Sequence, residues 1–551
     1  MLAGVGVPRT CIRVVNLILH LAEETMTTTR GAILRNSFFA ACWLTMVIPV
    51  AAQQIQTEPL VSYEIEHDVS LPVSYLAQIA PKPKRGVAEM IEPKRRREPI
   101  VGLPGEDAAV QQAYLPSVHT TQILNFEGIR EDQGNDEVPD TNGAVGASQF
   151  VEITNYDFEV FDKATAKVIL PPTNANTIFA GFEGSCSGTD TADPVVLWDK
   201  LAERWLVSYI TDEFSLCVAI STGTDATGSY NRYAFGIGGF PDYPKYAVWP
   251  DAYYFSANVF GNGAAEPCSL DRDAMLKGKS KAAMICFAAE KGNFSFLPSD
   301  LDGATLPPQG EPNHYVELGS STNSLNEYDF HVDFAHPKKS TFTGPQVISV
   351  PSYRLTCGPV NCIPQPPPGE LLEAEADRLL FRLAYRNFGD HESMVVVHSV
   401  AAGKGSTAIS AMRWYELRST PSGGKFSGYQ AGTFQSKSTS LWMGSAAMDK
   451  QGNIALGMSA SGKTVKPSIW YTGRLASDPL GKMEAPTVAM KGTAIETGDN
   501  QRWGDYSSMS VDPVDDCSFW YSQMYYNKKH GGPASGDWSS RVVVFKFDSC
   551  K

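Results

Sequence analysis

The chain is short of positive charge and contains no apolar run long enough to cross a membrane. It has 46 Lys and Arg against 60 Asp and Glu, which gives a formal net charge of −14. A net negative protein repels phosphate groups and gains nothing from counterion release, so we expect neither nucleic acid nor an anionic membrane as a partner. The apolar run from Phe38 to Val50 is shorter than a membrane-spanning helix.

Familiar catalytic signatures are also missing. The sequence has no His-Glu-x-x-His zinc motif, no Gly-x-Ser-x-Gly nucleophile turn and no phosphate-binding P-loop. Helical spacing is nearly absent, because apolar residues alternate or run together and seldom recur three or four positions apart. These absences argue against the common zinc proteases, serine hydrolases and nucleotide-binding proteins, and against a helical fold.

One sequence motif, called the repeated phrase below, recurs with variations along the chain. It consists of a polar or Asp-led start, a small and apolar strand, a tight acidic turn and an aromatic-rich strand. The copies start at Asp193, Asp242, Gly444 and Arg502. Repeated hairpins at intervals of about fifty residues are typical of a radial array of small antiparallel sheets. The sequence therefore predicts an all-β fold, a β-propeller.

We expect seven blades, although six or eight also fit because the fourth unit is long and rich in proline. Each unit contains short runs rich in Val, Ile, Tyr, Phe and Trp, separated by Gly, Asp and Pro turns. The units cover residues 140–180, 190–236, 240–290, 293–350, 377–420, 426–476 and 495–549. One stretch differs: Gly369 to Arg378 is charged and is predicted to form a helical turn between two blades.

A radial array must close its ring, since an unpaired sheet edge invites aggregation. The natural closing piece is the segment from Ile123 to Phe126 or the strand from Val542 to Phe547. We therefore expect residues 111–551 to form one domain in which residues 111–130 are structural.

The N-terminus carries a secretion signal. Arg30 and Arg35 form a positive region, the apolar run follows, and Val50-Ala51-Ala52 is a small-residue cleavage site before Gln53. Residues 26–52 are thus predicted to be a signal peptide and residues 1–25 an upstream extension. A buried N-terminal helix is the alternative.

Residues 53–110 are predicted to be a disordered linker. The stretch contains the basic, Pro-rich segments Pro81 to Arg85 and Pro93 to Arg97 and lacks long apolar patterns. Such a composition does not bury enough surface to order itself. A site of proteolytic processing or of surface adhesion is the functional alternative.

Eight cysteines remain after removal of the signal. An even number in an exported protein favours disulfides, and no pair has the tight Cys-x-x-Cys spacing of a zinc site. A hairpin blade brings chain neighbours together, so we predict the pairs Cys186 with Cys217, Cys268 with Cys286, Cys357 with Cys362 and Cys517 with Cys550.

Polar residues at the starts of the inner strands are expected to converge at one mouth of the central channel. The predicted ligand-binding residues are Asp140, Asn142, Asp193, Tyr243, Lys245, Arg386, Arg502, Trp503 and Tyr506. Carboxylates can bind sugar hydroxyls and aromatic rings can stack on sugar faces, which makes a carbohydrate site one interpretation. The other is structural: Asp and Asn cap backbone N–H groups, and aromatic side chains fill the space between blades.

Four residues are candidates for catalysis: Asp242, His391, Glu392 and Asp505. Two carboxyl groups at a suitable distance could serve as the acid and base of a glycosidase. We expect no bound metal. The weaker metal patterns are His391 with Glu392, the set His331, Asp333 and His336, and a calcium-like loop from Ser299 to Gly303.

Three long segments carry a family resemblance: Asp193 to Trp205, Arg382 to Met394 and Arg502 to Tyr526. They resemble a group of large secreted bacterial proteins, mostly uncharacterised, that are regarded as β-propellers. The resemblance spans roughly residues 122–550; it implies export and the propeller fold and brings no catalytic residues. More distantly, the blades resemble sialidase-type propellers. The chain lacks the complete Ser-x-Asp-x-Gly-x-Thr-Trp box and the Phe-Arg-Ile-Pro motif, which argues against sialidase activity.

Three functions fit these patterns. The first is binding of an extracellular glycan or a cell-surface protein by a secreted or periplasmic monomer. The second is a glycoside hydrolase or lyase that uses the carboxylates at the channel mouth together with His391 and Arg386. The third is a structural envelope or adhesion protein.

Overall fold

The computed structural model describes residues 58–79, 107–116, 120–131 and 138–551, apart from gaps at 188–190, 212–213, 261–263, 290–291, 358–360, 404–407, 421–423, 498–501 and 528–537. The predicted upstream extension, the signal peptide and the two basic segments lie outside the described residues. The described residues form one compact unit of β-sheets.

The strands of this unit pair mainly with their neighbours in sequence. The first sheet contains β4 (Asn142–Val145), β5 (Gln149–Ile153), β6 (Asp157–Asp162) and β7 (Val168–Asn174). The second contains β8 (Thr191–Asp199), β9 (Arg204–Thr211), β10 (Ser215–Ser221) and β11 (Tyr230–Gly236). The third contains β12 (Phe240–Val248), β13 (Tyr253–Phe260), β14 (Ala264–Leu270) and β15 (Ala283–Cys286). One sheet of eight strands follows, with β16 (Leu297–Leu301), β17 (Asn313–Leu318), β18 (Ser324–His331), β19 (Thr341–Ser349), β20 (Leu380–Asn387), β21 (Glu392–Ala402), β22 (Ile409–Ser419) and β23 (Ser427–Phe434). The last two sheets contain β24 (Ser440–Met448), β25 (Ile454–Gly462), β26 (Val465–Arg474) and β27 (Thr487–Met490), and β28 (Ser508–Val511), β29 (Phe519–Tyr526) and β30 (Trp538–Phe547).

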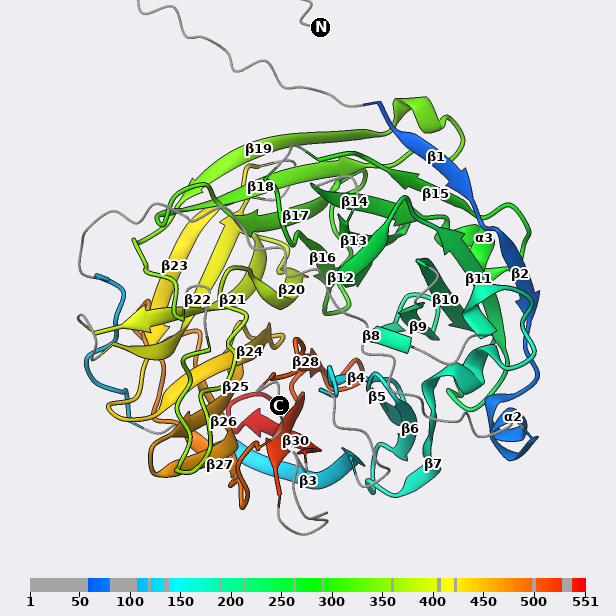
Figure 1. Cartoon of the computed structure of the whole chain (residues 1–551). Coiled ribbons are helices and arrows are strands. Elements are labelled where there is room, and N and C mark those ends of the chain that lie inside the picture. Colours follow the sequence, from blue (N-terminus) through cyan, green and yellow to red (C-terminus); the bar gives the residue numbers. More distant parts are fainter. Residues whose placement is uncertain are drawn as a thin grey trace, which may run out of the picture. The chain divides into compact units, whose positions relative to one another are not determined.

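The first strands of these groups form a ring. Each packs against the next in the order β4, β8, β12, β16, β20, β24 and β28, and β28 packs against β4. Figure 1 shows these strands around the centre, with the later strands of each sheet farther out. This radial order of antiparallel sheets is a β-propeller and confirms the predicted fold class. The eight-stranded sheet consists of two antiparallel halves that are joined by the parallel pairing of β16 with β20, and the count of seven blades stays a prediction.

The first strands are buried on both faces because each lies between two neighbouring sheets. Every residue of β12 and of β24 is buried, whereas β7 and β27, at the outer ends of their sheets, expose several side chains. A strand that is covered on both faces has a continuous buried sequence rather than a strict alternation. This position explains why the first strand of the repeated phrase is small and apolar.

The acidic turns of the repeated phrase stabilise the inner hairpins. Between β8 and β9, the Asp199 carboxylate accepts the backbone N–H groups of Leu201 and Ala202 at 3.0 and 3.1 Å. Between β24 and β25, the Asp449 carboxylate accepts the N–H of Gln451 at 2.8 Å. A side chain that bonds the backbone two or three residues ahead pre-forms the turn. These aspartates therefore have a structural role.

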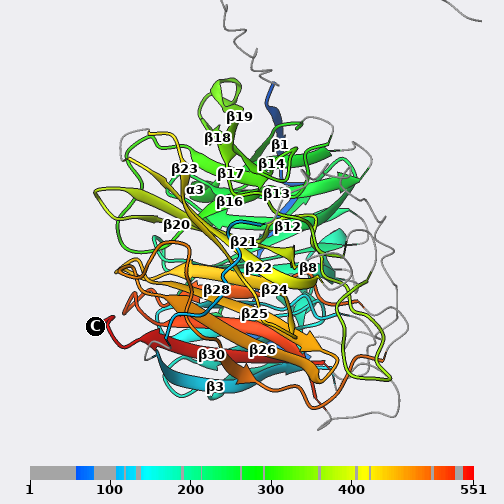
Figure 2. The same ribbon diagram turned by 90° about the vertical axis from the view of Figure 1, so that its left-hand side faces the viewer.

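Strand β3 (Thr120–Arg130) closes the ring. It pairs with β30, with Thr120 opposite Phe547 and Phe126 opposite Val542. Both views show the two strands side by side (Figures 1 and 2). The N-terminal part of the chain thus completes the sheet of the C-terminal strands, which confirms the predicted closing piece.

The predicted linker contains ordered elements, which differs from our expectation for residues 53–110. Strand β1 (Leu60–Tyr63) pairs with β15 as a fifth strand, and β2 (Glu66–Val69) pairs with β11 in the same way (Figure 1). Helix α2 (Val73–Ile79) follows and buries Val73 and Leu76. The segment is too polar to build a core of its own, but an existing sheet edge satisfies its backbone hydrogen bonds.

All four predicted disulfides are present: Cys186–Cys217, Cys268–Cys286, Cys357–Cys362 and Cys517–Cys550. Each joins neighbours along the chain, as the hairpin architecture requires. Disulfides of this number fit a protein of an oxidising, extracytoplasmic compartment.

Helices are short and few in the part of the chain that the structure describes. They are α2, α3 (Arg272–Leu276) and the 3-10 turns η1 (Ala175–Phe179), η2 (Ser185–Ser187) and η3 (Pro337–Lys339). None of these described helices has the length and apolar character needed to span a membrane. The predicted helical turn at residues 369–378 is wrong: Leu372 instead forms a β-bridge with Ile363. The predicted boundary at residue 426 is also wrong, since β23 pairs with β22.

Candidate functional site

Five segments that precede or begin first strands meet at one end of the ring centre. Together they form the mouth cluster, which consists of Asp140, Asp193, Asp242, Tyr243, Lys245, Glu373, Glu375, Asp377, Arg378, Arg502, Asp505 and Tyr506. The backbone of Asp140, Asp193 and Tyr243 has φ values of 47°, 50° and 55°. A left-handed backbone is costly for residues other than glycine and persists only where the surrounding contacts fix it.

A chain of hydrogen bonds links four of these segments. The Asp505 N–H donates to Asp140 Oδ1 at 2.6 Å, and Asn155 Nδ2 donates to Asp140 Oδ2 at 2.7 Å. The Asp193 N–H donates to Asn155 Oδ1 at 3.0 Å, and the Tyr243 N–H donates to Asp193 Oδ2 at 2.9 Å. Each side chain caps the backbone of a neighbouring sheet, so Asp140 and Asp193 stabilise the ring in addition to furnishing the site.

Lys245 lies deep in the cluster between two aromatic rings. Its Nζ is 3.0 Å from the ring centroid of Tyr243 and 3.5 Å from that of Tyr506. The Tyr506 hydroxyl donates to the carbonyl oxygen of Pro244 at 3.1 Å, which fixes its ring. Burial lowers the pKa of Lys245 well below its usual value, against the charge of Asp193 and other carboxylates. The aromatic rings and the carboxylates together hold the amine.

Arg378 connects Tyr243 to two acidic side chains. Its guanidinium carbon lies 4.7 Å from the Tyr243 ring centroid. Its Nη2 is 2.6 Å from Glu375 Oε2, and its Nε is 2.9 Å from Asp377 Oδ1. Burial raises the pKa of Glu375 well above its usual value, although Arg378 acts in the opposite direction. These residues come from the segment that was predicted to be a helical turn.

The solvent side of the cluster is formed by Glu373, Asp377 and Arg502, which we name the rim. Their side chains are 22%, 26% and 28% exposed. Arg502 Nε is 3.3 Å from Glu373 Oε2, and its Nη2 is 3.2 Å from Asp505 Oδ1. Because Asp505 is 2% exposed, Arg502 connects the rim to the buried part of the site.

The mouth cluster is electrostatically unbalanced. Seven of its residues are carboxylates and three are cations. Burial and the charge of Asp242 raise the pKa of Asp193 to about 7. Burial and the charges of Asp505 and Asp193 raise the pKa of Asp140 well above its usual value. Asp193 Oδ1 is buried and has no hydrogen-bond partner among the described residues. The cluster therefore has capacity to accept hydrogen bonds or positive charge.

The raised pKa of Asp193 predicts a pH dependence of stability. Between the usual pKa of an aspartate and about 7, the folded protein holds a proton that the unfolded chain releases, so parent stability falls as pH rises through this window. We expect the stability of Asp193→Asn to lack this pH dependence. From about pH 4 to about pH 8, the free energy of unfolding of the variant should therefore rise by about 2 to 4 kcal/mol relative to that of the parent. Denaturant unfolding across that range measures the effect, and parallel curves would contradict it.

Two predicted site residues lie in the interior of the sheets. Asn142 is fully buried, and its Oδ1 accepts the N–H of Val196 at 3.1 Å, which joins β4 to β8. Trp503 is also fully buried, with its ring centroid 4.9 Å from that of Trp442 and 5.6 Å from that of Tyr526. The hydrogen bond and the ring packing give both residues structural roles.

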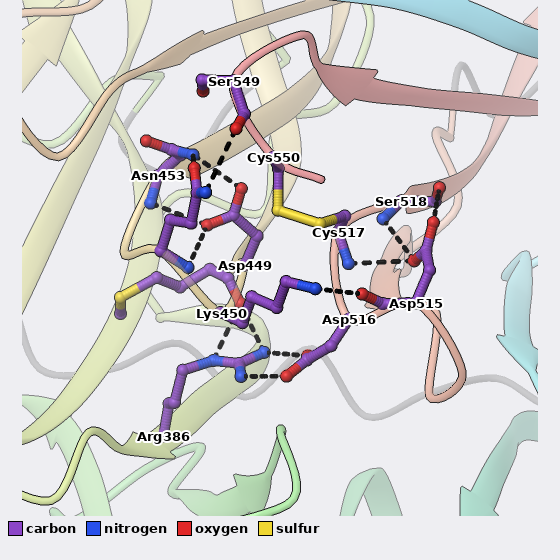
Figure 3. Close-up of a disulfide and its surroundings, with 12 residues drawn as sticks. Arg386, Asp449, Lys450, Asn453, Asp515, Asp516, Cys517, Ser518, Ser549 and Cys550 are labelled. Atoms are coloured by element: carbon purple, nitrogen blue, oxygen red, sulfur yellow. Dashed lines mark hydrogen bonds and ion pairs between the residues drawn. A yellow bond between two sulfur atoms is a disulfide. The ribbon is translucent and has the colours of Figure 1, made fainter.

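Arg386 lies near the C-terminal end of β20, whereas Arg378 precedes the start of this strand. Its Nη1 and Nη2 bond the Asp516 carboxylate at 2.8 and 2.7 Å, and its Nη2 donates to the carbonyl oxygen of Met448 at 2.9 Å. Figure 3 shows this ion pair beside the Cys517–Cys550 disulfide. The expected convergence of Arg386 with the mouth residues is wrong, because the strand carries it to the opposite side.

His391 and Glu392 belong to the same opposite side. His391 stacks on Phe388 at a centroid distance of 4.8 Å, and its Nδ1 is 2.7 Å from the Asp390 carboxylate. Glu392 is fully buried and accepts hydrogen bonds from Tyr385 and, at 2.8 Å, from Ser419. The placement separates them from Asp242 and Asp505, with which they were expected to act.

The predicted metal patterns have other partners. In the calcium-like loop, Asp300 and Asp302 bond the Arg382 guanidinium, with closest distances of 2.7 Å to each. His331 is exposed, and His336 Nδ1 lies 3.3 Å from Asp333 Oδ2. Ion pairs with Arg382 occupy the loop carboxylates that calcium would require.

Sequence comparisons leave the family undetermined. No family model matches the chain, and no curated protein matches it. The resemblance to secreted bacterial propellers and, more distantly, to sialidase-type propellers stays a prediction.

Comparison with solved structures finds remote likeness. The WD40 domain of fission yeast SCAP has a TM-score of 0.30 and 7% identity over 73% of this chain and 82% of that chain. The catalytic domain of a GH62 α-L-arabinofuranosidase from Coprinopsis cinerea has a TM-score of 0.32 and 9% identity over 79% of this chain and 100% of that chain. Drosophila Plexin A in complex with Semaphorin 1b has a TM-score of 0.35 and 9% identity over 79% of this chain and 88% of that chain. Likeness of this size carries no inference about activity.

Proposed function

We propose that the protein is a secreted β-propeller that binds an extracellular glycan at the mouth cluster. The observation that carries the proposal is the excess of carboxylates around Asp193, whose Oδ1 has no hydrogen-bond partner among the described residues. A buried polar atom without a partner costs about 1 to 3 kcal/mol. A ligand hydroxyl, or a water that the ligand orders, would supply the missing donor.

The rim provides the chemistry for first contact with such a ligand. Glu373 and Asp377 accept hydrogen bonds from sugar hydroxyls, while the Arg502 guanidinium donates them. All three side chains are partly exposed, and Arg502 leads to the buried Asp505. A surface protein with a basic segment is the second class of ligand that fits this acidic rim.

The test is a glycan array with the purified mature protein and two variants. We expect Arg502→Ala to weaken binding at least tenfold, because it removes the cation of the rim and leaves Asp505 and Glu373 without it. Lys277→Ala, at the C-cap of helix α3 with a side chain that is 56% exposed, is the matched loss of one positive charge and should bind like the parent. Binding of no glycan by the parent, or equal binding by Arg502→Ala, would overturn the proposal.

A glycoside hydrolase is the second candidate. The pKa of Asp193, about 7, suits a group that donates or accepts a proton near neutral pH. A screen of the parent on chromogenic glycosides tests this function. Turnover that Asp193→Asn abolishes would support the hydrolase, and binding without turnover would support the binding protein.

Export, cleavage before Gln53 and a monomeric state belong to the same proposal. The four disulfides support an extracytoplasmic location. A protein that is secreted but binds neither glycan nor surface protein would favour the structural envelope or adhesion function.

A further inference from the structure

A histidine and three carboxylates meet at β17 and β18, and none of them belongs to the mouth cluster. His314 Nδ1 lies 3.0 Å from Glu327 Oε1 and 2.9 Å from Asp329 Oδ1. His314 Nε2 lies 3.3 Å from Glu311 Oε1. His314 is directly opposite Asp329 in the antiparallel register. Glu327 is two residues from Asp329 and so shares its side of the sheet.

The group is buried except at one point. The side chains of His314, Glu311 and Glu327 are 4%, 7% and 5% exposed, whereas that of Asp329 is 46% exposed. The ring of Phe426 stands edge-on to the imidazole at a centroid distance of 4.7 Å. Aromatic packing thus covers the group on one side, and Asp329 leaves a path to solvent.

A proton on His314 does not balance the negative charge of the surrounding carboxylates. His314 Nδ1 carries at most one hydrogen, but two carboxylate oxygens lie within hydrogen-bond distance of it. A protonated imidazole supplies one positive charge against the two buried carboxylates of Glu311 and Glu327 and the partly exposed carboxylate of Asp329. Buried carboxylates without matching positive charge are strongly destabilising. A divalent cation between the Nδ1 atom and the two carboxylates would supply the missing charge.

We propose that His314 Nδ1, Glu327 and Asp329 bind a divalent transition-metal ion and that Glu311 orients the imidazole from behind. Donor atoms at adjacent positions of an octahedral ion, with bonds of about 2.1 Å, lie about 3.0 Å apart. The observed separations of 2.9 and 3.0 Å from Nδ1 match that spacing. A metal-bound histidine characteristically donates its other N–H to a carboxylate, and Glu311 Oε1 is placed for this role at 3.3 Å from Nε2, although the pair is not aligned as a hydrogen bond in this structure.

The donor set selects the kind of ion. One imidazole favours a transition metal over calcium and magnesium, and the octahedral donor spacing with two carboxylates suits manganese, whereas zinc usually prefers a tetrahedral site with donors about 3.3 Å apart. Three protein donors leave further positions for water on the side of Asp329. The site goes beyond the proposed glycan-binding function and does not depend on it, because it uses other strands and other residues.

The experiment is a titration of the chelator-treated mature protein with zinc chloride, repeated with manganese chloride. We expect one zinc or manganese ion per chain and a raised melting temperature. Asp329→Asn should weaken the affinity for that ion at least tenfold and remove the thermal shift. Because Asp329 is exposed, this variant is expected to fold. Asp333→Asn removes a nearby partly exposed carboxylate and should bind the ion like the parent.

Each outcome decides the proposal. Failure of the parent to bind either ion stoichiometrically overturns it, and the four residues are then a protonated histidine with its carboxylates. Unchanged affinity in Asp329→Asn also overturns it, because the ion would then occupy another place. Loss of affinity in Asp329→Asn with retention in Asp333→Asn supports it.

Discussion

Removal of residues 53–130 is expected to prevent the mature chain from folding. The deletion takes away β3, whose backbone pairs with β30 from Thr120 to Arg130 and whose Ile129 is fully buried. Without β3 the edge of β30 is open and the final sheet loses its outer strand. We expect a loss of more than about 5 kcal/mol in the free energy of unfolding, or no secreted protein at all. Thermal and denaturant unfolding of the secreted product measure it.

A shorter deletion separates the closing strand from the segment before it. Removal of residues 53–106 keeps β3 but takes away β1, β2 and α2. We expect a folded protein that is less stable by a few kcal/mol, because Val73 and Leu76 lose their buried sites. Equal stability of the two truncated proteins would contradict the closing role of β3.

A single substitution tests the same closure with the chain length unchanged. A Cβ atom added at Gly128 would lie 1.9 Å from Glu152 Oε2 and 2.5 Å from Ser540 Oγ. Gly128→Ala should therefore push β3 away from Glu152 of β5 and Ser540 of β30 and lower the melting temperature. Gly223→Ala, where nothing lies within 4 Å, is the matched control and should melt like the parent.

The propeller could be predicted because its strands have a local signature. An Asp at a tight turn accepts nearby N–H groups wherever the turn occurs, as Asp199 and Asp449 do. The inner strands are apolar because sheets cover both faces. The disulfide pairs followed from the same hairpins, since neighbours along the chain lie side by side. Each of these features depends on residues that are close in sequence.

The order of β1 and β2 could not be predicted from their composition. Their stability depends on the edges of β15 and β11, which are more than a hundred residues away in sequence. Leu60, Tyr63 and Ile65 remain more than half exposed, so no alternating burial pattern marks the segment. Pairing with a distant edge leaves little trace in the local sequence.

The candidate site could be predicted only in part. Asp140, Asp193, Asp242, Lys245 and Asp505 were expected to lie together because each precedes or begins a first strand. The same rule failed for Arg386, which sits at the far end of its strand. It missed Glu375 and Arg378, since the irregular segment before β20 gave no strand signal. The group around His314 was missed because Glu327 and Asp329 come from a different strand.

The second large effect is expected at Arg382, which links three parts of the ring centre. On β20, Arg382 is 5% exposed, and its guanidinium bonds Asp300 at 2.7 Å and Asp302 at 2.7 and 2.9 Å. It also donates to the carbonyl oxygen of Met509 at 3.3 Å, next to the start of β28. Arg382→Met should cost about 3 to 5 kcal/mol, because two buried carboxylates lose their counter-ion. Denaturant unfolding at neutral pH measures this loss.

An exposed ion pair provides the control. Lys277→Met removes the partner of Asp273, but the two side chains are 56% and 64% exposed, so the change should be under about 1 kcal/mol. A similar loss in both variants would show that charge removal in general, rather than burial, sets the cost.

The loss of stability caused by Arg382→Met should be smaller at acidic pH. Burial would raise the pKa of Asp302, but the charge of Arg382 lowers it below the usual value. The parent therefore keeps this stabilisation above the usual pKa of an aspartate and loses it as pH falls through the lowered value. In Arg382→Met the same carboxylates are buried without a cation, so they bind protons more readily and the variant gains stability relative to the parent as pH falls. The difference in unfolding free energy between the two proteins should thus decrease from neutral pH to about pH 4, and a constant difference would mean that Arg382 acts through packing rather than charge.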